Sequence, residues 1–298
     1  MHNPYLQLIG ISTSYGNVGL ELTTHNTIAF LEFLGSPDIP VYQGSSKPLE
    51  GDAPEASYIH GTTGIGGAQG YLSENPHVKC KTDINYIEAI NNAAKDAHGE
   101  LCVIVTGPLT NLSKVLDKYP NFGDQVQYIS IMGGAFGLGN ITPYAEFNLY
   151  SDPLAAEKVF TNVFLQDNKL ILSPLNITHK CIATKAIRNT FKGKKGSLFR
   201  SITNFYAERY AKVSPTGPPV HDPVAVFSLI AVLERKQKEY GYQCWHETVQ
   251  VALEGEKRGE TTMFENGSSN GVYIGYDINP QAFWDAVSDA IVSLEHNN

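Results

Sequence analysis

The stretch Leu101-Cys-Val-Ile-Val-Thr-Gly-Pro-Leu-Thr-Asn111 decides the fold class of this 298-residue chain. The run 101–106 is apolar on both faces, as a strand buried inside a parallel sheet requires. A Gly-Pro turn follows it and leads into a helical pattern. We therefore expect a strand over 101–106 that passes within a few residues into a helix.

Similar runs recur on both sides of this unit. Further strands are predicted over 6–13, 126–132, 169–173, 248–252 and 272–276. Asp83 predicts the cap of a helix that ends at Gly99, and Asn279-Pro280 opens a last helix. Alternating strands and helices predict an α/β fold with an open, mainly parallel sheet and helices on both faces. We expect a single domain over 1–298.

The composition excludes several classes of protein. With 22 Lys and Arg against 30 Asp and Glu, the net charge of −8 argues against a nucleic-acid surface, which needs a basic face. The four cysteines show no zinc spacing, which fits a reducing compartment. The chain has neither an apolar run of about 18 residues, as a membrane span requires, nor a signal-peptide pattern at Met1-His-Asn-Pro. We expect a cytoplasmic protein, with the nucleus as a second location.

Polar loops follow the predicted strands, where ligands bind in open α/β sheets. These loops are rich in Asn, Glu and Gly and poor in Lys and Arg. Amides and carboxylates suit sugar hydroxyls, which both donate and accept hydrogen bonds, whereas phosphate favours basic residues or a glycine-rich helix start. The pattern therefore predicts a pocket for a small polyhydroxylated ligand. The loops are 14–17, 106–111, 132–140, 146–148 and 174–179.

Each of three motifs has both a structural and a functional interpretation. Gly61-Thr-Thr-Gly-Ile-Gly-Gly67 lacks the Lys of a Walker loop and is either a plain surface loop or a loop near the pocket. Met132-Gly-Gly134 is either a simple turn or part of the site. In His221-Asp222-Pro223, Asp222 is either a helix cap before a first-turn proline or, with His221, an acid and metal-ligand pair.

Taken together and in this order, the motifs resemble the inosine–uridine family of nucleoside N-ribohydrolases, whose fold is Rossmann-like. The resemblance runs from Leu6 to Phe283-Trp-Asp285, and Pro174-Leu-Asn-Ile-Thr-His-Lys180 is similar to the cytosolic uridine-cleaving branch in eukaryotes. The motifs that carry it are Ser14-Tyr-Gly-Asn17, Ile59-His-Gly-Thr-Thr-Gly64, Val105-Thr-Gly-Pro-Leu-Thr-Asn111, Met132-Gly-Gly-Ala135, Gly139-Asn-Ile-Thr-Pro143, Ala145-Glu-Phe-Asn148 and Val220-His-Asp-Pro223.

This resemblance implies hydrolysis of the N-glycosidic bond of uridine, inosine or cytidine by a water held on a calcium ion. It implies that His60 and His221 lie near the base as candidate proton donors, which an ordinary imidazole pKa near 6.5 would permit. Asp222 and the Thr106 carbonyl are the implied calcium ligands, and a homodimer or homotetramer is the implied assembly. The implied substrate-binding residues are Asn17, Met132, Asn140, Glu146, Phe147 and Asn148.

The chain departs from the family pattern at one point. The family begins with a strand and an Asp-rich loop, Asp-x-Asp-Pro-Gly-x-Asp-Asp, that supplies most calcium carboxylates and the general base; here the first acidic residue is Glu21. Loss of that strand and its helix predicts exposed strand edges and weakened or lost calcium binding. Three interpretations stay open: a truncated form of a longer enzyme, a catalytically impaired nucleoside-binding relative, or carboxylates supplied by another chain.

Overall fold

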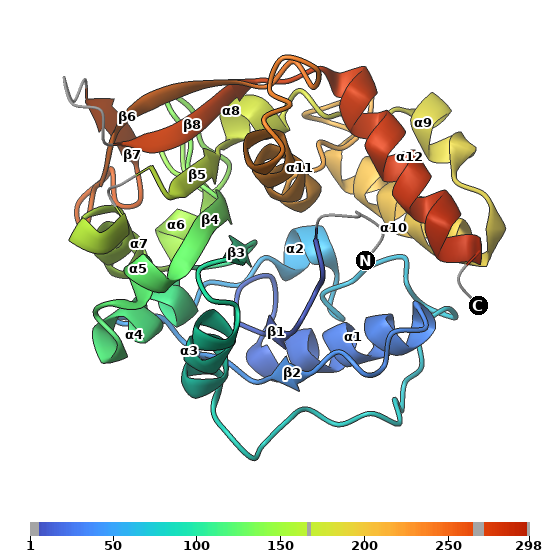
Figure 1. Cartoon of the computed structure of the whole chain (residues 1–298). Coiled ribbons are helices and arrows are strands. Elements are labelled where there is room, and N and C mark those ends of the chain that lie inside the picture. Colours follow the sequence, from blue (N-terminus) through green and yellow to red (C-terminus); the bar gives the residue numbers. More distant parts are fainter. Residues whose placement is uncertain (1–5, 166–167, 265–270, 297–298) are drawn as a thin grey trace.

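The computed structural model describes residues 6–165, 168–264 and 271–296, and its elements are arranged as Figure 1 shows. The strands of these ranges are divided equally between the two halves of the chain. They are Ile11–Ser12 (β1), Val41–Tyr42 (β2), Leu101–Val105 (β3), Val126–Met132 (β4), Leu170–Ser173 (β5), Gln243–Val251 (β6), Thr261–Phe264 (β7) and Val272–Asp277 (β8).

Helices connect the strands and cover both faces of the main sheet, with α10 and α12 side by side at one end of the molecule (Figure 1). The helices are Leu20–Phe33 (α1), Ser57–His60 (α2), Tyr86–Asp96 (α3), Thr110–Lys118 (α4), Phe122–Gln125 (α5), Phe147–Ser151 (α6), Pro153–Phe160 (α7), the 3-10 turn Val163–Leu165 (η1), Leu175–Thr178 (α8), Lys185–Thr190 (α9), Gly193–Tyr210 (α10), Asp222–Leu233 (α11) and Pro280–His296 (α12).

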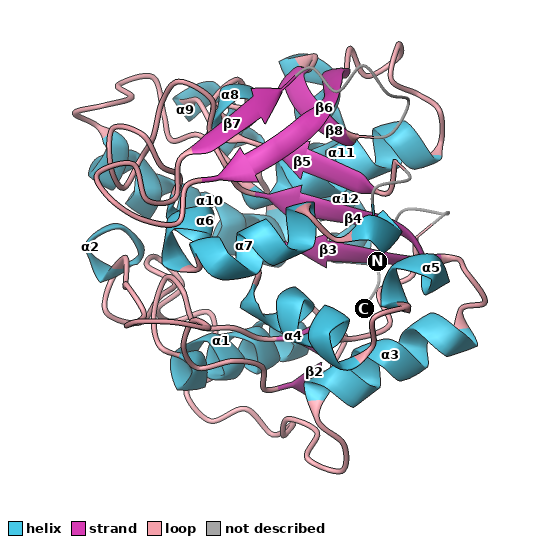
Figure 2. Ribbon diagram, turned by 90° about the vertical axis from the view of Figure 1, so that its left-hand side faces the viewer, coloured by secondary structure: helices cyan, strands magenta, loops and turns pink. Residues whose placement is uncertain are grey.

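Six strands form one sheet in the order β3-β4-β5-β8-β6-β7, and Figure 2 shows them one above another, from β7 at the top down to β3. The pairs β3–β4, β4–β5 and β5–β8 are parallel, and β6 pairs antiparallel with both β8 and β7. The open, mainly parallel sheet predicted from the sequence is therefore confirmed. Parallel pairing places the carboxyl ends of β3, β4 and β5 at one edge, where α/β folds bind ligands.

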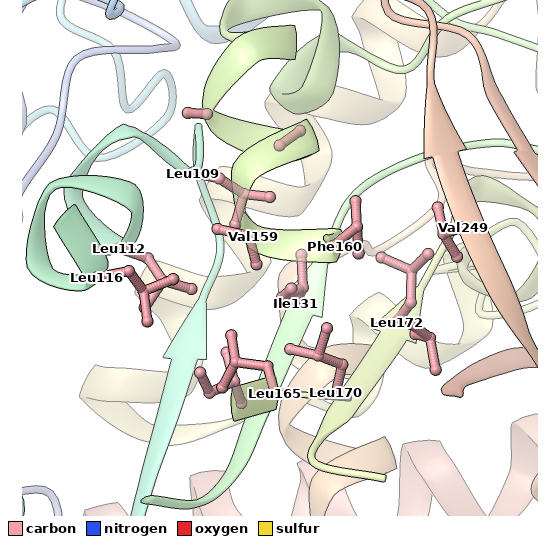
Figure 3. Packing of buried hydrophobic residues seen from close by; sticks show 14 of the residues in the cluster. Leu109, Leu112, Leu116, Ile131, Val159, Phe160, Leu165, Leu170, Leu172 and Val249 are labelled. Carbon is pink, nitrogen blue, oxygen red and sulfur yellow. The ribbon is translucent and has the colours of Figure 1, made fainter. Parts of the chain in front are cut away.

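The two faces of the sheet carry separate cores, because successive side chains of a strand point to opposite faces. Leu170 and Leu172 of β5 pack with α4 and α7 on one face, whereas Ile171 between them packs with α11 and α12 on the other. Figure 3 shows the first of these cores, where Leu112 and Leu116 of α4 approach the sheet beside α7. The three β5 residues are fully buried, as the apolar sequence predicted.

The N-terminal strands form a separate two-stranded parallel sheet, β1–β2. Among the described residues, β1 pairs only with β2 and β3 pairs only with β4, so each leaves one edge open. Ile104 of β3 keeps 38% of its surface exposed, although the sequence predicted a fully buried strand. Because any open sheet ends in strands that are paired on one side only, the absence of a family strand at this place stays a prediction.

Several predicted boundaries were wrong. The strand expected over 6–13 is confined to β1, and Leu8 and Ile9 before it are exposed. Helix α3 is capped by Asn85 rather than Asp83, because the Asn85 side chain accepts a hydrogen bond from Glu88 N (3.0 Å). Strands β2 and β7 were not predicted, and β6 begins before the predicted 248–252. No helix in the described ranges is long and apolar enough to cross a membrane.

Candidate functional site

The loop after β4 is built around the buried carboxyl of Glu146. One oxygen accepts a hydrogen bond from Asn148 N (2.7 Å), and the other accepts from Gly134 N (3.0 Å) and Leu149 N (3.1 Å). Glu146 thus caps α6 and fixes the Gly-Gly turn, a role that the sequence analysis did not give it. Burial raises the pKa of this carboxyl to about 7, against the lowering effect of the three N–H donors.

Asn148 lies against the end of β4 and is positioned by its amide group. Its Nδ2 donates to the Met132 carbonyl oxygen (3.1 Å), while its Oδ1 has no partner among the described residues. Met132 and Phe147 are buried beside it. Asn140 is exposed and accepts a hydrogen bond from Phe147 N (2.9 Å). Five of the six predicted substrate-binding residues, Glu146 included, therefore lie together at the end of β4 and in the loop after it, and the Asn148 oxygen remains available to a ligand hydroxyl.

Asp222 is the first residue of α11 and does not cap it. The described structure shows no side-chain cap at this helix start, so the interpretation of Asp222 as an ordinary cap was wrong. Solvent reaches Asp222, but protein surrounds its carboxyl on most sides, and this desolvation raises its pKa to about 7. A carboxyl in this state favours a ligand that brings it a hydrogen-bond donor.

His221, directly before α11, contacts α8. Its Nδ1 lies 2.8 Å from the hydroxyl of Thr178, and its ring centroid is 5.7 Å from that of His179. Its Nε2 is buried and has no hydrogen-bond partner among the described residues. Desolvation, with a contribution from His179 and His60, lowers the pKa of His221 to about 3. The ring is therefore neutral near pH 7, unlike the ordinary histidine on which the sequence argument relied.

His60 ends α2 and faces α10. Its Nδ1 lies 2.8 Å from the Tyr206 hydroxyl, and burial lowers the pKa of the imidazole to about 4. The glycine loop after His60 packs tightly on α10, since a Cβ at Gly66 would overlap the Phe205 ring and one at Gly67 would lie 2.6 Å from the Ser201 carbonyl oxygen. This loop holds α2 against α10 and has no feature of a phosphate site.

The electrostatic contacts show which predicted residues the fold brings together. The charge of Asp222 raises the pKa of both Glu146 and Tyr206, and His60 lowers that of His221. Residues from α2, the β4–α6 loop, α10 and α11 thus face a common region.

Asn17 and Thr106 are placed less directly. The Asn17 carbonyl accepts a hydrogen bond from Ala56 N (3.1 Å), which ties its loop to the start of α2. Thr106 is exposed at the end of β3, against which α11 packs. Both therefore belong to segments that border the site.

The residues of this site do not make a calcium centre by themselves. Calcium takes about six to eight oxygen ligands, and the described residues contain no group of three or more His, Cys, Asp or Glu able to hold a metal. Both oxygens of Glu146 already accept backbone hydrogen bonds, which leaves Asp222 as the carboxyl with free acceptor capacity, together with the Thr106 carbonyl. The donor set does not fit the ion.

The sequence placed Thr178 and His179 in the pocket loop 174–179 without giving either residue a role, and it assigned no contact to Tyr206. The motif containing Thr178 and His179 follows a strand, and that position was the available signal. Tyr206 lies in a helix far from His60 in sequence, so only the fold reveals its contact.

Comparisons with known proteins agree on one family. Residues 1–285 match the family model described as inosine-uridine preferring nucleoside hydrolase. The uridine nucleosidase of Saccharomyces cerevisiae is 35% identical over 97% of this chain and 89% of its own length. The Leishmania major inosine-uridine preferring nucleoside hydrolase is 34% identical over 76% of this chain and 72% of its own length. A solved purine-preferring ribonucleoside hydrolase from Gardnerella vaginalis superposes with a TM-score of 0.87 at 26% identity, covering 98% of this chain and 92% of its own.

Proposed function

Because the chain belongs to the inosine-uridine preferring nucleoside hydrolase family, we propose that it cleaves the N-glycosidic bond of ribonucleosides to free base and ribose. The observation that carries the proposal is that Asp222 lies near enough to Glu146, and His60 near enough to the neighbouring His221, for the charge of one to shift the pKa of the other. Uridine is the first substrate to test, since the yeast relative is named a uridine nucleosidase.

Each group has a role that its surroundings support. The Asp222 carboxylate accepts a hydrogen bond from a ribose hydroxyl or from the attacking water. Asn148 Oδ1 accepts from a second ribose hydroxyl, while Glu146 and Asn140 keep the α6 loop in place. His60 and His221 face the base as neutral rings, each able to donate one N–H. Cleavage through an oxocarbenium-like state then needs only small movements of these positioned groups.

Calcium would supply water activation and ribose binding if it were held here. Asp222 and Thr106 offer too few ligands for tight binding by the described chain, so we expect calcium to bind weakly. Assembly as a homodimer or homotetramer and a cytoplasmic location are further proposals, which sedimentation analysis and microscopy of the tagged protein would test.

A second candidate function is nucleoside binding without efficient turnover. The specific observation in its favour is that the described residues contain no carboxylate cluster beside Asp222. A general base contributes typically ~100- to 10,000-fold to such reactions, so its absence would leave recognition largely intact while lowering kcat.

Ribose release from uridine and inosine separates the two candidates when it is measured with added calcium and with EDTA. Release by a catalytic amount of the 298-residue chain supports hydrolysis. A folded chain that binds uridine by calorimetry but releases no ribose supports the binding protein. A folded chain that neither releases ribose nor binds uridine would contradict both candidate functions.

A further inference from the structure

The Thr178–His221 pair joins two elements that flank the site. Thr178 ends α8, is completely buried, and places its hydroxyl oxygen 2.8 Å from His221 Nδ1. The direction of this hydrogen bond decides which nitrogen of the imidazole carries the proton, because a neutral ring has one donor and one acceptor.

The surroundings of Thr178 settle that direction. Its backbone N–H already donates to the Pro174 carbonyl oxygen, and its hydroxyl has no partner in the described chain other than His221. If Nδ1 carried the proton, the Thr178 hydroxyl would accept it and its own hydrogen would be buried without an acceptor, which is costly. That tautomer would also leave the buried Nε2 as an acceptor without a donor. If the hydroxyl donates to Nδ1 instead, only the Nε2 hydrogen lacks a protein partner, so this arrangement leaves fewer buried polar groups unsatisfied.

We propose that Thr178 is a positioning residue that donates to His221 Nδ1 and holds the ring as its Nε2–H tautomer. Nε2 then carries a hydrogen that has no acceptor among the described residues. His221 is half-buried although Nε2 itself is covered, so a side-chain adjustment on binding brings a ligand acceptor to it.

The chemical consequence deepens the proposed function and rests on it. A fixed Nε2–H recognises a base with a hydrogen-bond acceptor, such as the O2 carbonyl of a pyrimidine, and stabilises the charge that collects on the base as the glycosidic bond breaks. Thr178 itself does not touch the substrate in this arrangement. Its effect on turnover passes through the orientation and tautomer of His221.

The first test is nitrogen NMR of the chain labelled in its histidine rings, with His221 assigned by comparison with His221→Gln. The expected result is a protonated Nε2 and an unprotonated Nδ1 for His221 in the wild-type protein and in Thr178→Ser. In Thr178→Val the bond to Nδ1 is lost, so a mixture of tautomers is expected. The control Thr24→Val removes another buried hydroxyl, which bonds to Thr13 and Leu20, and should leave the His221 signals unchanged.

A second readout is kinetic. Thr178→Val should lower kcat for uridine about tenfold, as expected when one hydrogen bond that orients His221 is lost, and Thr178→Ser should restore it. A wild-type His221 protonated on Nδ1 would overturn the proposal, whatever the activity. A chain without ribose release but with the Nε2–H tautomer would refute the proposed function and leave the role of Thr178 standing. The wild-type spectrum decides the question even if Thr178→Val fails to fold.

Discussion

The dipeptide Asp-Pro opens two helices of this protein, with opposite results. At the start of α7, Asp152 is fully buried and accepts hydrogen bonds from Leu49 N (2.9 Å), the Thr110 hydroxyl (2.6 Å) and Ala155 N (3.1 Å). At the start of α11, Asp222 is reached by solvent, caps nothing, and has a pKa raised to about 7 by desolvation.

The difference lies in where the residue falls relative to the first helical turn. Asp152 stands before α7 as its N-cap, so its side chain folds back onto the helix. Asp222 is one position further in, as the first residue of α11, and no side-chain capping hydrogen bond forms at this helix start. The same dipeptide thus provides a helix cap at α7 and an acceptor without a hydrogen-bond donor at α11, and only the acceptor at α11 is suited to a ligand.

The largest effect is expected when the unsatisfied acceptor is removed. Asp222→Asn should lower kcat for uridine about 100-fold or more, because the amide cannot accept as a charged carboxylate does. Steady-state ribose release checks this, and Asp289→Asn on the exposed side of α12 is the matched control with unchanged kcat. If the chain binds nucleosides without turnover, the uridine Kd should rise about tenfold instead. Unaltered kcat and Kd would show that Asp222 has no part in the site.

The structural member of the pair should respond in the opposite way. Asp152→Asn weakens three hydrogen bonds to a buried charge and should destabilise the protein by about 2 kcal/mol. Denaturant unfolding measures the loss. The kcat of the molecules that remain folded should stay within about twofold of the wild-type value, since Asp152 faces α4 and the loop of Leu49. A collapse of kcat with unchanged stability would reverse the roles of the two residues.

A pH series sharpens the contrast. The Asp222 pKa rises from about 3.9 in the unfolded chain to about 7 in the folded protein. The folded state therefore holds the proton more tightly than the unfolded chain does. Protonation of Asp222 thus adds to the free energy of unfolding below about pH 4, and this contribution is lost as the pH rises through 7. Asp222→Asn escapes this loss and should be more stable than wild type by about 1 kcal/mol at pH 8, after a discount for solvent and the helix dipole.

Thermal unfolding at pH 4 and pH 8 measures this advantage. It should be near zero at pH 4 and should amount to about 2 °C in Tm at pH 8 for a chain of this size. An advantage that is equal at both values would place the Asp222 pKa outside this window. The comparison uses the variant and the wild type at each pH, so the histidines that titrate in the same range contribute equally to both.

The fold could be predicted from the sequence wherever burial dictates the pattern. The runs at β4, β5 and β8 are apolar because helices cover the sheet there, and α12 begins at the predicted Asn279-Pro280. The strands Val41–Tyr42 and Thr261–Phe264 were not predicted, because a segment of two to four residues is too short to show the alternation of apolar and polar residues that identifies a strand. The cap of α3 was misplaced by two residues, since Asp83 and Asn85 are equally good caps and only the contact with Glu88 selects one.

The site was predictable as a set of loops and less so as chemistry. The rule that ligands bind beyond the carboxyl ends of parallel strands located Asn148 and Glu146, and the family resemblance pointed to Asp222. The rule could not reveal that both oxygens of Glu146 accept hydrogen bonds from three backbone N–H groups. It also could not reveal that burial keeps His60 and His221 neutral. Such properties depend on neighbours that are distant in sequence, as Tyr206 is from His60.

The smallest expected effects come from the two prolines, and they test whether the contrast belongs to the aspartates alone. Pro223 is exposed in the first turn of α11, so Pro223→Ala should cost about 0.5 kcal/mol, mainly through the greater freedom of the unfolded chain. Pro153 is buried, and Pro153→Ala should cost about 1 kcal/mol because ring atoms also leave a packed region. Urea unfolding resolves this difference, and neither variant should change kcat by more than about twofold. A large loss of kcat in Pro223→Ala alone would mean that the ring, and not only helix geometry, aims the Asp222 carboxyl into the site.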